Sequence, residues 1–275
     1  MEKELQKFAA HLAQEERSTG TIEKYIRDVR HLQNWLDGRT VTRETIGNWR
    51  DALLRDGFAP VTINSMLAAV NSFLRFCGRE DCRVKSLRIQ RRLFRDTTRE
   101  LTRGEYQRLW ETAHAEGKER LALLMESICA TGIRVSEVRY LTVEAVRAGR
   151  TEISLKGKIR TILLPAKLCR RLLKYAKAQK IASGEIFVTR SGKSLSRWQI
   201  WAELKAICKQ AGVMASKVFP HNLRHLFART FYQVTRDVAQ LADVMGHSRI
   251  ETTRIYLVST GAEHARQMEK LGLLQ

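Results

Sequence analysis

The residues best suited to chemistry gather in the last fifth of the chain. His221 and Arg224 stand three positions apart in what reads as the first turn of a helix. Residues at this spacing lie on one helix face, so the two side chains could bind one small anionic group together. Farther on, His247 follows a glycine that ends another helix, and Tyr256 comes nine positions later. A tyrosine beside such cationic groups is a candidate nucleophile.

An arginine far upstream completes the set. Arg134 lies in Thr-Gly-Ile-Arg-Val-Ser-Glu, where a helix is predicted to end at Gly132 and the arginine starts the next turn. Glu137 could hold the guanidinium of Arg134 in a salt bridge or lie simply at the surface. A guanidinium stays charged and binds phosphate through two parallel hydrogen bonds. Arg134 and Arg224, from distant segments, could therefore clamp one phosphate.

These residues, in this order and spacing, resemble those of the tyrosine recombinase (phage integrase) family, and the resemblance covers nearly the whole chain. It implies that Tyr256 attacks a DNA phosphate and forms a covalent 3′-phosphotyrosyl intermediate, assisted by Arg134, Arg224, His221 and His247. Such an intermediate conserves the bond energy, so no ATP, metal or other cofactor is expected. The sequence agrees, since it contains no phosphate-binding Gly-x-x-x-x-Gly-Lys loop and no carboxylate cluster typical of Mg²⁺ sites.

The family also implies a lysine on a β-hairpin that protonates the leaving 5′ oxygen. Lys156, in Leu155-Lys-Gly, matches the family pattern. Lys158 is a competitor, because this hairpin is one residue longer before its proline than in many relatives. His225 directly follows Arg224 and is interpreted as structural, pointing away from the face that carries His221.

Composition points to a polyanionic partner. Of 275 residues 44% are hydrophobic, enough for two compact domains. Lys and Arg number 49 against 29 Asp and Glu, a formal charge of +20, which favours double-stranded DNA as the partner. A membrane partner is disfavoured because no basic amphipathic helix or lipidation signal is visible. No membrane span or signal peptide is seen, and five cysteines without metal-ligand spacing indicate reduced thiols in a cytoplasmic protein.

The N-terminal part reads as an all-α domain over residues 1–82. Apolar residues at helical spacing predict helices over 2–17, 21–36, 43–54 and 61–76. The family has a similar SAM-like core-binding domain that clamps DNA. A basic linker follows over 83–98. Candidate DNA-binding residues in the linker and on the hairpin are Arg83, Lys85, Arg88, Arg91, Arg92, Lys158 and Arg160.

The C-terminal part, residues 99–275, reads as an α+β catalytic domain, so the fold class is mainly α with a small antiparallel sheet. Helices are predicted over 102–114, 118–129, 166–180, 196–210 and 222–234, and strands over 151–155 and 159–164. Trp198 and Trp201 are expected to be core or helix-packing aromatics and not platforms on which bases stack. An amphipathic helix is predicted over 262–271. The resemblance implies that it docks on a neighbouring protomer, which would bring four subunits together on DNA from monomers free in solution; packing on its own domain is the alternative.

The function that the resemblance implies is site-specific recombination between two DNA sites. A type IB topoisomerase shares this chemistry but relaxes one duplex, and usually has a lysine where His221 stands. A DNA-binding relative that has lost activity is the non-enzymatic alternative. The helical bundle begins almost at Met1, so a further arm-binding domain is not expected. Xer-like resolution and integration of a mobile element or phage both stay open, with the mobile element preferred.

Overall fold

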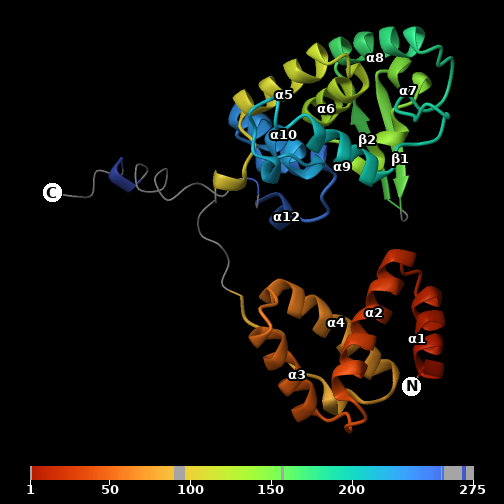
Figure 1. The fold of residues 1–275 in the computed structure, drawn as a ribbon, viewed down its shortest axis with the longest axis vertical. Coiled ribbons are helices and arrows are strands. Elements are labelled where there is room, and N and C mark those ends of the chain that lie inside the picture. Colours follow the sequence, from red (N-terminus) through yellow and green to blue (C-terminus); the bar gives the residue numbers. More distant parts are fainter. Residues whose placement is uncertain (1, 90–96, 156–157, 255, 257–267, 271–275) are drawn as a thin grey trace. The chain divides into compact units, whose positions relative to one another are not determined.

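The chain folds as two compact units. The computed structural model describes residues 2–89, 97–155, 158–254, 256 and 268–270. Its contacts divide the chain into Met1–Arg92 and Leu93–Gln275, here called the N-terminal and C-terminal units (Figure 1). The division falls inside the stretch assigned to the basic linker. None of the helices in the described part of the chain combines the length and apolar character that a membrane-spanning segment needs.

Four helices build the N-terminal unit: α1 (Glu2–Gln14), α2 (Thr19–Leu36), α3 (Arg43–Arg55) and α4 (Pro60–Phe76). Each turns an apolar face inward, and Phe8, Trp49 and Leu67 are fully buried at the centre. The four predicted helices are confirmed. The first ends three residues earlier than predicted, just before Glu16 adopts a left-handed conformation with φ +57°.

Two asparagines of α4 hold the chain that leaves this unit. The side-chain amide of Asn71 exchanges hydrogen bonds of 2.9 and 3.2 Å with the backbone of Val84. Asn64 does the same with Leu87 at 2.9 and 2.7 Å. A short 3-10 helix, η1 (Glu80–Cys82), precedes these contacts. The beginning of the basic stretch is therefore fixed to the N-terminal unit.

The C-terminal unit is built around α6 (Glu119–Thr131), which packs against α5 (Arg103–Ala115), α8 (Ala166–Ala178) and α10 (Pro220–Thr235). The α6 residues Leu121–Met125 and Ile128 are buried. The remaining elements in chain order are η2 (Thr97–Arg99), η3 (Val135–Tyr140), α7 (Val143–Arg147), β1 (Arg150–Leu155), β2 (Lys158–Leu163), α9 (Arg197–Ala206), η4 (Ala215–Lys217), α11 (Val238–Met245) and α12 (Ile250–Arg254). The turn expected to start at Arg134 is η3, whereas the short helix α7 was not predicted.

The predicted hairpin is confirmed, as β1 and β2 pair antiparallel from Arg150 opposite Leu163 to Leu155 opposite Lys158. Ile153 and Ile162 face the core, while Leu163 is 75% exposed. This alternation is what a two-stranded ribbon with one covered face requires. The hairpin and α12 lie at the edges of the C-terminal unit (Figure 1).

Helix starts follow the predicted caps. The hydroxyl of Thr102 accepts a hydrogen bond from the backbone of Glu105, whose carboxylate accepts one in return, and Ser196 and Gln199 form the same box at α9. The helices α8 and α9 end earlier than predicted, at Ala178 and Ala206. After each of these two helices the chain continues in turns that do not complete the α-helical hydrogen-bond pattern, so the helix ends earlier than the sequence pattern indicates.

Of the two alternatives for Trp198 and Trp201, core packing is wrong. Trp198 is 71% exposed and Trp201 is 46% exposed. The buried face of α9 is formed instead by Ile200 and Leu204, which lie four positions apart. The cationic group of Lys205 lies 5.3 Å from the centre of the Trp201 ring. The five cysteines are free thiols, as expected.

Candidate active site

Arg134 leaves α6 through a turn that needs glycine. Gly132 caps α6 with φ +63°, and a Cβ at this position would lie 2.5 Å from Cδ1 of Phe227. Arg134 then becomes the N-cap of η3. Its Nη2 donates to the carbonyl oxygens of Met245 at 3.4 Å and Gly246 at 3.2 Å. The end of α6 is thereby joined to the end of α11.

Glu137 is a buried carboxylate that holds two arginines. Only 2% exposed, it accepts hydrogen bonds from Nη1 of Arg134 at 2.8 Å and from the Arg134 backbone at 2.9 Å. It also accepts one from Nη1 of Arg160 at 3.3 Å. A buried charge requires such partners, because burying it unpaired costs several kcal/mol. The predicted salt bridge between Glu137 and Arg134 is confirmed.

Arg160 reaches the same cluster from β2. Its side chain is 11% exposed, and Nη2 donates to the carbonyl oxygen of Val244 at 3.1 Å. Burial lowers its pKa, which the charge of Glu137 opposes and that of Arg134 reinforces. From its charge and its place on the hairpin, Arg160 was expected to contact DNA. The structure places its guanidinium against Glu137 and α11.

Arg224 occupies the interior of the site. It is 3% exposed on α10, where Nη1 donates to the carbonyl of Gly132 and Nη2 to that of Met245 at 2.7 Å. Burial first, and then the charges of Arg134 and Arg160, lower its pKa to about 10. Arg134 and Arg224, ninety residues apart in sequence, therefore share one carbonyl acceptor on α11.

His247 connects Arg224 to the tyrosine. Its Nε2 lies 3.3 Å from Nη2 of Arg224, and its Nδ1 lies 2.8 Å from Oγ1 of Thr253. The imidazole is stacked on the Tyr256 ring, with 5.9 Å between the ring centroids and 10° between the ring planes. Burial lowers the pKa of His247 to about 4, assisted by Arg224 and Arg134.

Two further imidazoles face the tyrosine from α10. The ring of His221 lies 6.4 Å from that of Tyr256, and the ring of His225 lies 4.4 Å from both of them. His225 is four positions after His221 and therefore shares its helix face. The interpretation that it points away was wrong for this reason. Burial lowers the pKa of His221, and lowers that of His225 to about 3.

Tyr256 is enclosed by these groups and by apolar side chains. It is 4% exposed and packs in a small cluster with Phe227, Leu241 and Met245. Its backbone N–H donates to the carbonyl of Thr253 at 3.0 Å. The phenol ring is thus held beside three imidazoles.

Taken together, the cluster is strongly cationic, because one carboxylate offsets only part of the charge of three arginines. The guanidinium groups of Arg134 and Arg160 pair with Glu137, whereas Arg224 shares the Met245 carbonyl with Arg134. Several of these donors are directed at the carbonyls of residues 244–246. Arginine donors fixed in a partly buried site stabilise negative charge without reorganising. Such a site can bind a phosphate and stabilise the charge that develops on it when a phenol attacks.

Other predicted residues lie outside this cluster. Lys156, Arg91 and Arg92 fall outside the described residues, and Lys158 is the first residue of β2. Arg83, Lys85 and Arg88 belong to the N-terminal unit. Lys85 and Arg88 are exposed, whereas Arg83 pairs with Glu80 at 3.1 Å.

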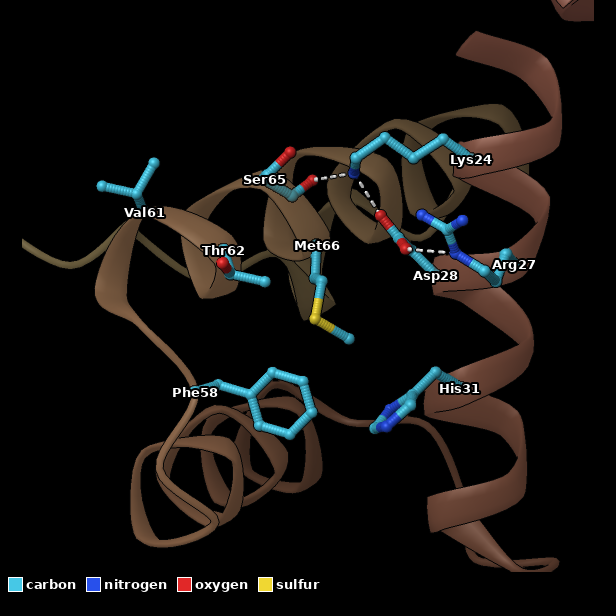
Figure 2. Close-up of a pocket in the computed structure, with 9 residues that line it drawn as sticks. All are labelled: Lys24, Arg27, Asp28, His31, Phe58, Val61, Thr62, Ser65 and Met66. Atoms are coloured by element: carbon cyan, nitrogen blue, oxygen red, sulfur yellow. Dashed lines mark hydrogen bonds and ion pairs between the residues drawn. The ribbon is translucent and has the colours of Figure 1, made fainter. Parts of the chain in front are cut away.

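The N-terminal unit has a groove of its own between α2 and α4, with a volume of about 450 Å³. Figure 2 shows Lys24 and Arg27 directed at Asp28, with the Lys24 ammonium also 3.3 Å from the carbonyl of Ser65. The ring of Phe58 forms part of the opposite wall. The groove combines cationic and apolar side chains.

Three members of the cluster were missed or misjudged from sequence. His225 could have been found from its spacing to His221. Arg160 carried a signal in its charge, but its inward direction depends on the hairpin register. Thr253 gave no signal, since a threonine in a short helix is common.

The sequence matches known protein families and relatives over most of its length. The sequence model of the phage integrase family matches residues 99–263, and that of the phage integrase N-terminal SAM-like domain matches residues 5–81. Tyrosine recombinase XerA of Pyrococcus furiosus is 28% identical over 98% of this chain and 94% of its own length. Tyrosine recombinase XerC of Roseiflexus castenholzii is 30% identical over 93% and 88%.

Solved structures agree on the fold. A lambda integrase dimer bound to a core site superposes with a TM-score of 0.74 at 15% identity, covering 93% of this chain and 94% of that one. The integrase of transposon Tn1549, in complex with transposon right-end DNA, gives 0.70 at 16% identity over 98% and 99%. Both likenesses support the two-domain architecture described above.

Proposed function

The chain belongs to the phage integrase family, and we propose that it recombines duplex DNA with Tyr256 as the attacking residue. Enzymes of this kind are tyrosine recombinases, which break and rejoin DNA. The observation that carries the assignment of roles is the meeting of Arg134 and Arg224 at the Met245 carbonyl, beside the ring of Tyr256. Two phosphate-binding side chains and one nucleophile are within one small volume.

The arginine contacts suggest how a phosphate would enter. Nη2 of Arg134 makes two long bonds, of 3.4 and 3.2 Å, to neutral carbonyls. An anionic phosphate oxygen is a stronger acceptor than a carbonyl, so it would take these donors. Glu137 would keep the other edge of the guanidinium in place. Arg134 is therefore proposed to turn one edge to the DNA phosphate while the opposite edge stays anchored.

The histidines are proposed to handle the phenol proton. A phenol is a weak nucleophile at neutral pH, so its proton has to be accepted during attack. The lowered pKa values of His221 and His247 favour neutral imidazoles, which can accept a proton. We assign His221 as the acceptor, and His247 as a second donor to the phosphate or to the Tyr256 oxygen.

Lys156 is proposed to protonate the 5′ oxygen as it leaves, with Lys158 as the competitor. A substrate with sulfur in place of that oxygen tests the role, because a thiolate leaves without a proton. Replacing the general acid by alanine should slow cleavage of ordinary DNA and leave cleavage of the sulfur substrate near the wild-type rate. Lys156→Ala and Lys158→Ala serve as controls for each other. Rescue of neither variant would contradict both assignments.

Duplex DNA is proposed to be held by both units. Solved structures of the same fold are complexes with DNA. The groove between α2 and α4, together with Lys85 and Arg88, would contact the backbone from the N-terminal unit. Four protomers are proposed to assemble on two DNA sites through the C-terminal segment, which includes the exposed Met268. Met268→Glu should reduce assembly on paired sites, measured by mass photometry, while binding to a single site is kept.

Covalent capture tests the central proposal. The full chain is incubated with fragmented DNA of its source organism, denatured in detergent, and the protein-linked fragments are recovered and sequenced. We expect adducts at a defined sequence, carried on Tyr256, and none with Tyr256→Phe. Two copies of the recovered site on one plasmid should then recombine. Adducts that persist in Tyr256→Phe, or that form equally on every sequence, would contradict the proposal.

A further inference from the structure

One side chain of α10 joins the start of this helix to the segment through which the chain enters the C-terminal unit. This entry segment, residues 97–102, consists of η2 and the three residues after it. Nδ2 of Asn222 donates to the carbonyl oxygens of Arg99 and Lys217, each at 2.7 Å, and the residue is 5% exposed. A carbonyl can only accept, so both amide hydrogens of Asn222 are used. Asn222 therefore joins the entry segment, the end of η4 and the first turn of α10.

Arg229, two turns farther along α10, makes a second attachment. Residues seven positions apart lie on one helix face, so Arg229 and Asn222 point the same way. Nη2 of Arg229 donates to the carbonyl of Leu101 at 2.7 Å, and Nη1 lies 2.6 Å from a carboxylate oxygen of Glu100. The Arg229 and Glu100 side chains are 11% and 18% exposed, so solvent screens this ion pair less than an exposed one. Two points on one face of α10 therefore hold the entry segment.

The first turn of α10 depends on these contacts because its N-cap residue cannot cap it. Phe219 stands at the N-cap and has no polar side-chain atom, and Pro220 occupies the first helical position. His221 follows Pro220 and directly precedes Asn222. The two hydrogen bonds of Asn222 therefore fix, from one residue away, the turn that carries the proposed proton acceptor.

An asparagine holds each end of the connection between the two units. Asn64 fixes Leu87 on the N-terminal unit, and Asn222 fixes Arg99 on the C-terminal unit. Arg99 is twelve positions after Leu87. A chain of this length can span at most about 40 Å. When the N-terminal unit is bound to DNA, this short connection limits where the entry segment, and hence α10, can lie.

We propose that Asn222 and Arg229 are positioning residues through which the placement of the N-terminal unit on DNA orients the helix that carries His221 and Arg224. The inference rests on the proposed function and makes it more specific. Neither positioning residue is proposed to touch the phosphate. If the entry segment were released, α10 would keep its packing against α6 but lose its connection to the DNA-bound unit. The cleavage rate would then no longer depend on the length of the linker.

Lengthening the linker tests this connection in the full-length protein. A flexible Gly-Ser-Gly-Ser sequence is inserted after Asp96, and single-turnover cleavage uses the duplex recovered by covalent capture. In the wild-type background we expect the insertion to slow cleavage about tenfold, a size typical of coupling between distant sites. Asn222→Leu and Arg229→Met should cleave more slowly from the outset, and the insertion should change their rates by less than about twofold. A purely structural role would leave the full effect of the insertion in both variants.

Arg120 provides a matched control for Arg229. It also pairs with one carboxylate, that of Glu203, and donates to one carbonyl, that of Val188, each at 2.6 Å. These contacts join α6 to α9 and to the segment before α9, not to the entry segment. Arg120→Met should lower the unfolding temperature as Arg229→Met does, yet the insertion should still slow its cleavage about tenfold. An insertion that has the same effect in all backgrounds, or none in the wild type, would overturn the proposal.

Hydrogen exchange separates this inference from the proposed function. The amides of residues 97–102 should exchange faster in Asn222→Leu and in Arg229→Met than in the wild type or in Arg120→Met, because the entry segment has lost an attachment. Unchanged exchange in both variants would overturn the proposal. A wild-type chain that forms no adduct would contradict the proposed function instead, and the exchange result would still decide whether α10 holds the entry segment.

Discussion

The side chain of Arg160 fills the space that a side chain on Gly246 would need. A Cβ built on Gly246 would overlap Cδ of Arg160 and lie 2.8 Å from its Nε. Gly246 also ends α11 with φ +63°, a conformation that favours glycine. The close approach lets Arg160 reach the Val244 carbonyl and Glu137 together. The strand β2 and the turn before His247 are thereby fixed to each other.

Gly246→Ala should therefore damage both stability and cleavage. The left-handed conformation alone costs about 1–2 kcal/mol for a residue with a Cβ. Displacement of Arg160 would add to it, and the free energy of unfolding should fall by roughly 3 kcal/mol in total. Covalent cleavage should fall more than tenfold, because Arg134 and His247 border the same turn. Thermal unfolding and single-turnover cleavage measure the two effects.

Gly149→Ala is the matched control for this change. Gly149 has φ +68°, and a Cβ added at this position would have no described atom within 4 Å beyond its chain neighbours. The alanine there should cost only the conformational part, about 1 kcal/mol, with cleavage unchanged. If the two alanine variants behaved alike, the contact between Arg160 and Gly246 would have no functional weight.

A second prediction concerns Glu137, the carboxylate that holds Arg134 and Arg160. Glu137→Gln keeps the shape but removes the charge, which leaves two neighbouring guanidinium groups without a counter-ion. Loss of one partner of a buried pair typically costs about 3–5 kcal/mol, and the remaining amide contacts reduce this to about 2–3 kcal/mol. Because Arg134 loses its anchor, cleavage should fall roughly tenfold or more.

An exposed glutamate provides the comparison. Glu152 lies 4.0 Å from Arg150, and both side chains are 63% exposed. Glu152→Gln should change the unfolding free energy by less than about 0.5 kcal/mol, since exposed ion pairs contribute little. Equal losses in the two variants would show that burial of Glu137 does not determine its effect.

A third prediction follows from the three neutral imidazoles. Burial lowers the pKa of His225 to about 3 and of His247 to about 4, and also lowers that of His221. In the unfolded chain each would titrate near pH 6.5. As pH falls below that value the unfolded state binds protons that the folded state refuses, so folding stability is lost. The unfolding temperature of the C-terminal unit should therefore fall between pH 7 and pH 5.

Most carboxylates stay ionised above pH 5, so protonation of the histidines should account for most of the fall in unfolding temperature. His225→Leu should reduce the difference in unfolding temperature between pH 7 and pH 5. His11→Gln alters a half-buried histidine of the other unit and should not affect that difference. An unfolding temperature that rose on acidification would contradict the buried, neutral state of these rings.

Much of this architecture follows from patterns in the sequence. Helical spacing of apolar residues predicted α1 to α6, and capping boxes at Thr102 and Ser196 set two of the helix starts. These signals are local, so they are visible without knowledge of the fold. The motif around Arg134 and the spacing from His221 to Tyr256 likewise carried the family resemblance.

The rest depends on contacts between distant segments. Arg160 turns inward only because the register of β1 and β2 aims it at Glu137, and register is a property of the pairing. Trp198 was expected to pack in the core or against a helix, yet it is exposed and the packed face of α9 is that of Ile200. The contact between Thr253 and His247 depends on how the turn after α11 leads into α12. None of these features can be predicted from the local spacing of residues in the sequence.

The last prediction concerns how DNA binding depends on salt. Each phosphate contact by Lys or Arg releases counterions, so the logarithm of the binding constant falls with log salt by about 0.9 per contact. Lys85 and Arg88 are exposed, on a segment fixed to the N-terminal unit by Asn64 and Asn71. If both contact the backbone, the double variant Lys85→Gln with Arg88→Gln should lower the slope by about 2. Fluorescence anisotropy with labelled duplex between low and physiological salt measures it.

Two lysines of α8 give a control with the same change in charge. Lys174 and Lys177 are exposed, and α8 lies at the opposite edge of the C-terminal unit from α12 (Figure 1). Replacing both by glutamine removes the same two charges from a surface remote from the proposed active site. The slope should then stay near the wild-type value, because long-range attraction is screened beyond about 8–10 Å. A flat wild-type response, or equal slopes for the two double variants, would mean that Lys85 and Arg88 do not contact the DNA backbone.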